Sequence, residues 1–216
     1  MASVVKPTRK YTATLRQEQA QMTRQRILDA GRRLLVSGSY SGVTMDDIAK
    51  EAGVAYQTVY SSFGSKLGLA QAIIKAGFPH VADAMTLTRQ GQQSPDPEVK
   101  LRTVARITRL IYEPCADLVR FMRESGDAVL VKRYRENEEL RYANERQGLG
   151  AWLRTSDRLR EGITPSEALA VIWAMTGSEH YAQLVFEKSW TPSRYEEWLG
   201  DALINMLLKP PSRRSR

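Results

Sequence analysis

The stretch that decides the fold is residues 44–69, Thr-Met-Asp-Asp-Ile-Ala-Lys-Glu-Ala-Gly-Val-Ala-Tyr-Gln-Thr-Val-Tyr-Ser-Ser-Phe-Gly-Ser-Lys-Leu-Gly-Leu. Thr44 and Asp47 have the spacing of a capping box, in which each side chain accepts a hydrogen bond from the backbone amide of the other residue. The box predicts a helix from Met45, and Gly53, which tolerates a left-handed backbone, ends it. After a turn over residues 53–55 a second short helix follows, so this stretch has the pattern of a helix-turn-helix.

The second helix of the pair has two kinds of side chain. Val59 and Phe63 fall on the side expected to face the core, and the others remain available to a partner: Tyr56, Gln57, Thr58, Tyr60 and Ser61. Ser65 is a good N-cap for the next helix, and Lys66 lies in its first turn. A cation gains nothing from the helix dipole at that end, and a bound phosphate would supply the reason for it.

These residues resemble the DNA-binding signature of the tetracycline-repressor (TetR) family of bacterial regulators. The resembling positions are Thr44, Asp47-Ile48-Ala49, Ala52-Gly53-Val54, Thr58-Val59-Tyr60, Phe63-Gly64-Ser65-Lys66 and Leu69. The resemblance extends back through a helix over residues 23–38, so it covers roughly residues 20–75, about a quarter of the chain. The chain departs from the family pattern at Leu67, where an acidic residue is usual, and at Ser62, where a His is frequent.

The resemblance implies an all-α protein with an N-terminal three-helix DNA-binding domain and a larger helical domain for ligand binding and dimerisation. It implies that Thr44, Tyr60 and Lys66 hold phosphates of double-stranded DNA. The second helix of the pair would lie in the major groove, with Ala55, Tyr56, Gln57 and Thr58 near its leading end. Glutamine can pair with adenine, whereas the methyl groups of alanine and threonine can meet that of thymine.

The function implied is a transcriptional regulator, most simply a repressor, that binds a palindromic operator as a homodimer and is released by a small-molecule effector. The alternative is a dimeric DNA-binding protein without a small-molecule response. We expect four segments: a flexible basic arm over 1–20, the helix-turn-helix domain over 21–68, the ligand-binding and dimerisation domain over 69–209, and a basic tail over 210–216.

The positive charge of the chain lies at its ends. Residues 1–33 sum to +6 and residues 209–216 to +4, whereas residues 34–208 sum to −2. Cationic arms suit a polyanion, because phosphate contacts release condensed counterions. We therefore expect Lys6, Arg9 and Lys10 to follow phosphates or enter a minor groove. The C-terminal tail is equally well explained as a solvated end.

The rest of the chain reads as helices. Residues 128–160 form a long charged segment, in which we expect Leu140, Leu149, Trp152, Leu153 and Leu159 inward and Arg133, Arg135, Glu136, Glu138, Glu139 and Arg141 on a solvated face. Thr164-Pro165 and Thr191-Pro192 begin the last helices. These helices are apolar on more than one face, which predicts cover by a second subunit. The residues expected in that dimer interface are Leu184, Tyr195, Trp198, Leu199, Ala202, Leu203, Met206 and Leu207.

A ligand pocket is expected between the central helices and the helix after Thr164, lined by aromatic and apolar groups with a few polar ones. The candidates are Tyr112, Phe121, Met122, Trp152, Trp173, Met175, Thr176 and His180. Each of these side chains can equally belong to the core.

Catalysis and cofactor binding have little support in the sequence. The two histidines, His80 and His180, are far apart and lack metal-ligand spacing, and no glycine-rich phosphate loop occurs. We expect no metal and no cofactor. The one cysteine, Cys115, excludes an intramolecular disulfide. Because no apolar run is long enough to cross a bilayer, we expect no membrane association and a cytoplasmic location, on the nucleoid when bound to DNA.

Overall fold

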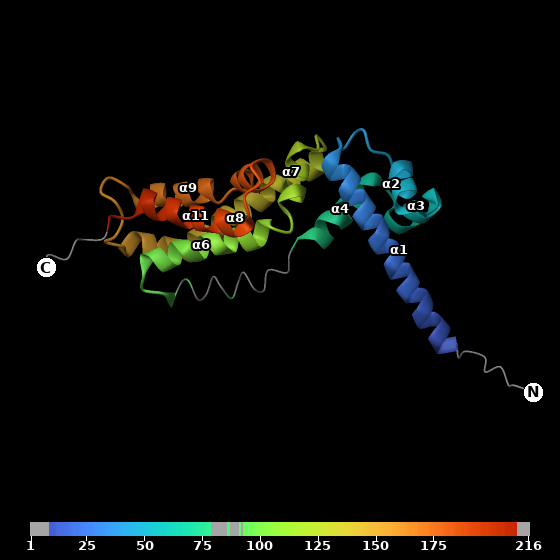
Figure 1. Cartoon of the computed structure of the whole chain (residues 1–216), viewed down its shortest axis with the longest axis horizontal. Helices are drawn as coiled ribbons and strands as arrows, with labels where there is room; N and C mark the ends of the chain where they lie inside the picture. Colours follow the sequence, from blue (N-terminus) through green and yellow to red (C-terminus); the bar gives the residue numbers. More distant parts are fainter. Residues whose placement is uncertain (1–8, 79–85, 87–90, 92, 211–216) are drawn as a thin grey trace, which may run out of the picture. The chain divides into compact units, whose positions relative to one another are not determined.

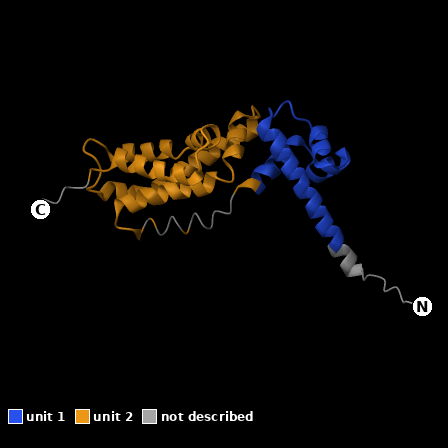
Figure 2. Cartoon of the chain, in the orientation of Figure 1, with its two compact units in different colours: residues 1–76 blue, residues 77–216 orange. Residues whose placement is uncertain are grey.

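A computed structural model describes residues 9–78, 86, 91 and 93–210 of the chain. Its described residues are helical, apart from loops and one isolated antiparallel bridge between Leu159 and Leu208. The chain divides into two compact units, residues 1–76 and 77–216 (Figure 2). The all-α fold expected from the sequence is therefore confirmed.

The described residues of the first unit form four helices, which Figure 1 labels. They are α1 (Arg9–Ser37), α2 (Met45–Ala52), α3 (Tyr56–Phe63) and α4 (Lys66–Gly77). The capping box at the start of α2 is complete, and Gly53 ends that helix with a left-handed backbone of φ 63°. The start and end of α2 and the turn before α3 are thus as the sequence predicts.

Two expected boundaries in this part of the chain are different. Residues 9–20 were expected in a flexible arm, but α1 already begins at Arg9. Residues 9–30 contain no glycine or proline and many strong helix formers, so nothing stops the helix from extending backwards. The first unit also reaches Ala76 rather than residue 68, because Leu69 and Ile73 of α4 pack against Gly31 of α1.

One compact core joins these four helices. Its members come from all four and are fully or almost fully buried: Ile27, Ala30, Leu35, Ile48, Ala49, Val59, Leu69, Ala70 and Ile74. Helices as short as α2 and α3 are marginal in isolation. Their conformation therefore depends on packing against α1 and α4.

The second unit is a helical bundle. Its helices are α6 (Pro97–Tyr112), α7 (Ala116–Glu124), α8 (Ala128–Thr155), α9 (Pro165–Met175), α10 (Ser178–Tyr181), the π-helical turn η1 (Ala182–Glu187) and α11 (Pro192–Leu207). The predicted starts at Thr164 and Thr191 are confirmed as N-caps followed by proline. His80 lies outside the described residues.

Helix α11 packs chiefly against α6 of the same chain. Four residues expected in a dimer interface, Tyr195, Leu199, Leu203 and Leu207, are 0% exposed within the single chain. That expectation is wrong for these four, because one apolar stripe of α11 is already covered. Trp198, Ala202 and Met206 lie on a second, partly exposed stripe, and Leu184 of η1 is half-buried.

Helix α8 also differs from its expected orientation. Leu140 was expected inward but is 59% exposed, whereas Glu138 and Arg141 were expected on a solvated face and are about four-fifths buried. The reason is mutual pairing, since Arg141 meets carboxylates on both sides along the helix and polar groups at the end of α9. Leu149 and Leu153 are buried as expected.

The packing of α11 leads to a stability prediction. Leu203→Ala should lower the free energy of unfolding by about 2–5 kcal/mol, because it removes a fully buried side chain and leaves a cavity. The matched control is Met206→Ala, because Met206 lies on the other stripe and is 46% exposed. This substitution should lower the free energy of unfolding of the single chain by less than about 1 kcal/mol. Denaturant unfolding of both variants measures this, and equal effects would contradict the assignment of Leu203 to the core.

Candidate DNA-binding site

Helix α3 presents an exposed face of uncharged polar and aromatic side chains. Tyr56, Gln57, Tyr60 and Ser61 are exposed, whereas Val59 on the opposite side is fully buried. The rings of Tyr56 and Tyr60 are stacked, with 6.2 Å between centroids and 20° between planes. Ala55, the exposed N-cap, makes no side-chain hydrogen bond, and Thr58 is half-buried. This face offers hydrogen-bonding and apolar groups without a charge of its own.

Thr44 is exposed but its hydroxyl has two intramolecular contacts. It accepts from the amide of Asp47 (3.1 Å) and donates to the carboxylate of that residue (2.6 Å). The hydroxyl and amide of Thr44 hold the pKa of the Asp47 carboxyl below its ordinary value. The residue expected to hold a phosphate therefore also fixes the start of α2.

Lys66 has a structural partner that the sequence did not reveal. Its ammonium group donates to the backbone carbonyls of Tyr40 (2.7 Å) and Val43 (3.0 Å) and lies 4.6 Å from the centroid of the Tyr40 ring. These contacts give the cation a structural reason to lie here, and the expected phosphate contact of Lys66 stays a prediction. Lys66 ties the loop before α2 to the start of α4, and so it positions the N-cap of α2.

Two arginines of α1 likewise donate to backbone carbonyls, at the C-terminal ends of α2 and α3. Arg26 Nη2 donates to the carbonyls of Ala52 (2.5 Å) and Gly53 (3.3 Å), where α2 turns toward α3. Arg24 Nη1 donates to the carbonyl of Ser62 (3.2 Å) at the end of α3, and its guanidinium lies 4.3 Å from the centroid of the Phe63 ring. The last carbonyls of a helix have no intrahelical donor and carry partial negative charge, so a cation stabilises them.

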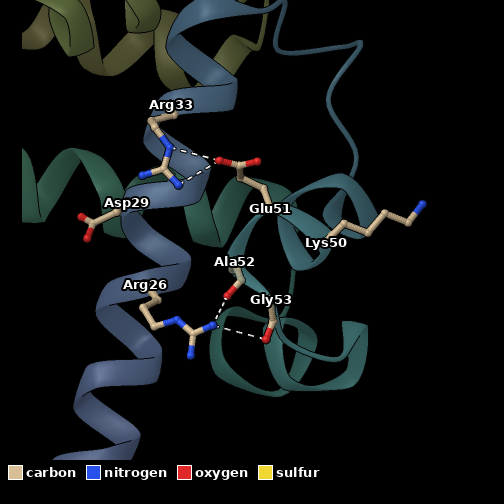
Figure 3. Close-up of a pocket in the computed structure, with 7 residues that line it drawn as sticks. All are labelled: Arg26, Asp29, Arg33, Lys50, Glu51, Ala52 and Gly53. Carbon is tan, nitrogen blue, oxygen red and sulfur yellow. Dashed lines mark hydrogen bonds and ion pairs between the residues drawn. The ribbon is translucent and has the colours of Figure 1, made fainter.

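A shallow hollow lies between α1 and α2 (Figure 3). Its seven lining residues are Arg26, Asp29, Arg33, Lys50, Glu51, Ala52 and Gly53. Arg33 donates through Nε and Nη2 to the same oxygen of Glu51 (3.2 and 2.9 Å), and Figure 3 shows Lys50 directed away from this pair. The basic side chains of this face of α1 are thus engaged with α2.

The basic arm cannot be placed. Lys6 lies outside the described residues, and Arg9 and Lys10 are within α1 but their side chains are not described. Arg16, further along α1, is exposed. Whether the arm contacts phosphates stays a prediction.

The expected pocket residues of the second unit lie in different environments. Tyr112, Phe121, Met122 and Thr176 are buried, and Trp152, Met175 and His180 are half-exposed. The structure brings Trp173 and Thr176 together around Arg141, whose guanidinium lies 5.1 Å from the centroid of the Trp173 ring and donates to the Thr176 hydroxyl (2.9 Å). Sequence reasoning missed Glu138, Arg141 and Glu145, although their spacing over two turns places them on one side of α8.

The described parts of both units hold no group of three or more His, Cys, Asp or Glu side chains suited to a metal ion. They also contain no helix with the length and apolar character needed to span a membrane.

Comparison with known proteins identifies the first unit. The family model of the bacterial regulatory proteins of the tetR family matches residues 27–73, which run from the middle of α1 into α4 and include α2 and α3. The match to the tetR family is thus one of this segment, residues 27–73. The HTH-type transcriptional regulator AlkX of Mycobacterium tuberculosis is 46% identical over 50 residues, 23% of this chain and 24% of AlkX. The chain spans about a quarter of the length of the curated HTH-type regulators that it matches.

A likeness in fold to solved structures extends over most of the chain. NalD of Pseudomonas aeruginosa, described as the secondary repressor of the MexAB-OprM multidrug efflux pump, has a TM-score of 0.63 at 20% identity, over 89% of this chain and 98% of NalD. FadR of Bacillus subtilis in complex with stearoyl-CoA has a TM-score of 0.60 at 16% identity, over 84% of this chain and 98% of FadR. At these identities the likeness is one of fold.

The contacts of Arg26 yield a prediction with a matched control on the same helix. Arg26→Ala removes both donors to the end of α2 and should lower the free energy of unfolding by about 1 kcal/mol, a figure reduced for the exposure of the side chain. Arg16→Ala, which changes an exposed arginine of α1, should change it by less than about 0.5 kcal/mol. Denaturant unfolding of the full chain measures both, and equal stabilities would contradict a capping role for Arg26.

Proposed function

We propose that this tetR-family regulator is a repressor that binds a palindromic operator in double-stranded DNA as a homodimer and is released by a small-molecule effector. The exposed uncharged face of α3 is the observation that carries the DNA-binding part. A helix held by a buried inner side chain and free on its outer side is the form of a reading helix that enters a major groove.

Within that proposal the exposed residues of the first unit have two roles. Ala55, Tyr56, Gln57 and Thr58 lie along the leading half of α3 and would meet base edges, while Thr44, Tyr60, Ser61 and Lys66 would hold the sugar-phosphate backbone. The two carbonyl contacts of Lys66 engage its ammonium group only in part, since an ammonium has three donors. Lys66 can therefore position α2 and still approach a phosphate.

Dimerisation is supported by a partly exposed apolar stripe on α11. Trp198, Ala202 and Met206 recur every four residues along one side of α11, beside the partly exposed Leu184 and Phe186 of η1. An apolar stripe of this kind is suited to the same stripe of a second copy, because an isologous interface repeats one patch on both subunits. These residues, rather than the buried half of our original set, form the proposed interface.

The effector part of the proposal is supported by the neighbours of similar fold, one of which is seen with stearoyl-CoA. The most informative experiment is selection of bound fragments from genomic DNA with the purified protein. If the bound fragments share a two-fold symmetric sequence, this result supports both the homodimer and the palindromic operator. A compound screen for release of that DNA then separates a ligand-responsive repressor from a DNA-binding protein without such a response.

Two substitutions should affect DNA binding in different ways. Gln57→Ala should relax the preference at one base position by about 1–3 kcal/mol, because it removes a group that can read a base edge. Lys66→Ala should weaken binding to every sequence alike, because it loosens the loop before α2 and removes a cation. Titrations of an operator and its single-base variants measure this, and equal losses on all sequences from both changes would contradict the assignment of α3 as the reading helix.

The uncovered stripe gives a prediction for assembly. Met206→Arg should shift the monomer–dimer equilibrium toward monomer by about tenfold or more, because it places a charge in the proposed apolar interface. Glu197→Arg, at an exposed position of α11 outside the stripe, is the matched control and should leave it unchanged. Sedimentation equilibrium decides, and a dimer unaffected by Met206→Arg would place the interface elsewhere.

A further inference from the structure

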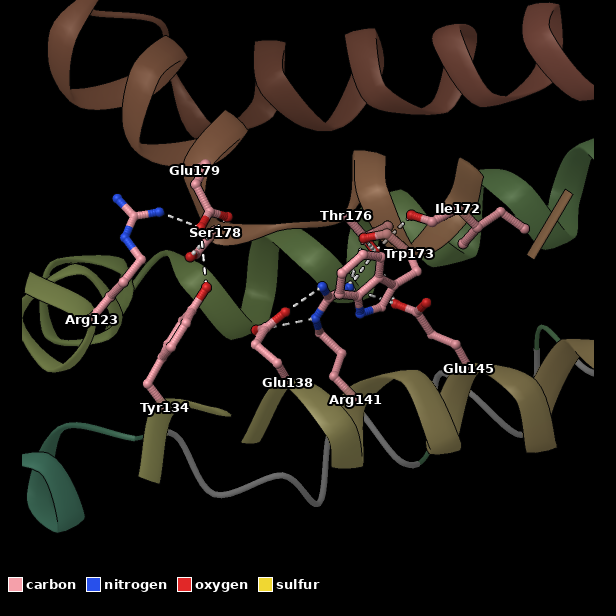
Figure 4. Close-up of polar contacts among 10 residues, drawn as sticks. All are labelled: Arg123, Tyr134, Glu138, Arg141, Glu145, Ile172, Trp173, Thr176, Ser178 and Glu179. Carbon is pink, nitrogen blue, oxygen red and sulfur yellow. Dashed lines mark hydrogen bonds and ion pairs between the residues drawn. The ribbon is translucent and has the colours of Figure 1, made fainter. Parts of the chain in front are cut away.

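The inner face of α8 is polar over three turns, where a helix packed in a bundle is ordinarily apolar. Tyr134, Glu138, Arg141 and Glu145 follow one another at steps of four, three and four residues, so they share one side of the helix. Figure 4 shows these side chains directed toward the junction of α9 and α10. We call Glu138, Arg141 and Glu145, with Trp173 and Thr176 opposite, the polar seam.

The seam carries one more negative charge than positive. Arg141 donates to Glu138 (2.6 Å) and to Glu145 (3.1 Å), and the three side chains are only 16–20% exposed. Two carboxylates therefore share one guanidinium largely away from water, where an unpaired charge is unfavourable. Nearby, Arg123 is paired with Glu179, and the Tyr134 hydroxyl also donates to Glu179 (3.2 Å). The charge of Arg123 is therefore already balanced and does not offset the excess negative charge of the seam.

One carboxylate oxygen of the seam has no donor among the described residues. Glu145 Oε1 accepts from Arg141 and from the hydroxyl of Thr176 (2.8 Å), whereas Oε2 is shielded from solvent and no donor among the described residues reaches it. Burial raises the pKa of the Glu145 carboxyl, which the charge of Arg141 and the bond from Thr176 offset only in part. The position favours a further cationic donor.

A second unpartnered group lies in the same interior. The hydroxyl of Tyr195 on α11 is fully buried, and no hydrogen-bond partner is found for it among the described residues. Tyr195 is close enough to the seam for the charge of Arg141 to lower its pKa, although burial raises that pKa more. Among the described residues, two buried polar atoms of this unit, Glu145 Oε2 on α8 and the Tyr195 hydroxyl on α11, thus have no hydrogen-bond partner, which is uncommon in a native core unless another molecule supplies one.

Trp173 is the part of the seam that a ligand would meet first. It is 36% exposed, its ring lies against the Arg141 guanidinium, and it packs nearly perpendicular to the ring of Tyr142, with 6.1 Å between centroids. An aromatic face that already holds a planar cation can hold another. Because the ring is partly in solvent, its rotation can open the seam without unfolding a helix.

We propose that the polar seam binds a small organic cation with N–H donors on an aromatic body, that Glu145 is its charge partner, and that such cations are the effector class. The statement that these cations are effectors rests on the proposed function. A neutral ligand would leave the charge of the seam unbalanced, and an anion would add to the imbalance. Since Glu145 also holds Thr176 at the end of α9, a cation at Glu145 acts directly on the junction of α9 and α10.

The test uses the full chain and a pair of probes that differ in charge. Benzamidine carries a planar amidinium on an aromatic ring, and benzamide is its neutral counterpart. In calorimetric titrations benzamidine should bind saturably and at least about tenfold more tightly than benzamide. Equal affinities, or no saturable binding of benzamidine at millimolar concentrations, would overturn the proposal on the unmodified protein alone.

Variants locate the site. Glu145→Gln should weaken benzamidine binding at least about tenfold, whereas Glu139→Gln, exposed on the same helix, should leave it unchanged. If Glu145→Gln does not fold, Glu145→Asp, which keeps the charge but withdraws it from the seam, should also weaken binding. Benzamidine should change the tryptophan fluorescence of the protein but not that of Trp173→Phe. Unchanged binding in a folded Glu145 variant would remove the site from the seam.

A DNA measurement separates this inference from the proposed function. On a fragment recovered by genomic selection, benzamidine should weaken binding of the unmodified protein but not of Glu145→Gln. A protein that binds benzamidine through Glu145 without any change in DNA affinity would overturn the effector assignment. Absence of sequence-specific DNA binding without benzamidine would overturn the proposed function, while the calorimetric comparison would still decide the cation site.

Discussion

The helix-turn-helix of this protein depends on cations that hold backbone carbonyls. Arg26 donates to the carbonyls at the end of α2, Arg24 to one at the end of α3, and Lys66 to two in the loop before α2. Helices of eight residues leave as many orphan carbonyls at their ends as they form regular bonds inside, so their ends decide their stability. Each of these contacts also ties a short helix, or the loop before one, to a longer helix.

This use of basic residues changes how the charge of the first unit is understood. Eight Lys and Arg residues within 1–33 suggest a surface made for phosphate, yet several on α1 lie against α2 and α3 instead. The charge does not vanish, because a guanidinium bonded to a neutral carbonyl remains cationic. In the proposed complex it would add to the attraction of DNA at long range, while its hydrogen bonds hold the ends of α2 and α3 against α1. The same residues would then both attract DNA and position the two short helices.

The sequence predicts well what depends on near neighbours. The capping box at Thr44, the helix start at Thr164, the left-handed Gly53 and the exposed face of α3 all follow from residues within a few positions of one another. It predicts poorly what depends on distant partners. Lys66 has its partners 23 and 26 residues away, and Arg26 has its partners 26 and 27 residues away. Likewise the two apolar stripes of α11 are visible in the sequence, but not which one α6 covers.

The charged row of α8 shows why periodicity alone misplaces ionisable residues. A run rich in Glu and Arg is ordinarily a solvated face, since isolated charges are not buried. The rule does not hold for three residues that form hydrogen bonds with one another and with Thr176, namely Glu138, Arg141 and Glu145. Because this side of α8 faces inward, Leu140 lies at the surface. Replacing such a cluster by apolar residues is often neutral or stabilising, so stability alone is a weak reason to have it. A binding role for the seam accounts for both the burial of its charges and the oxygen they leave unpaired.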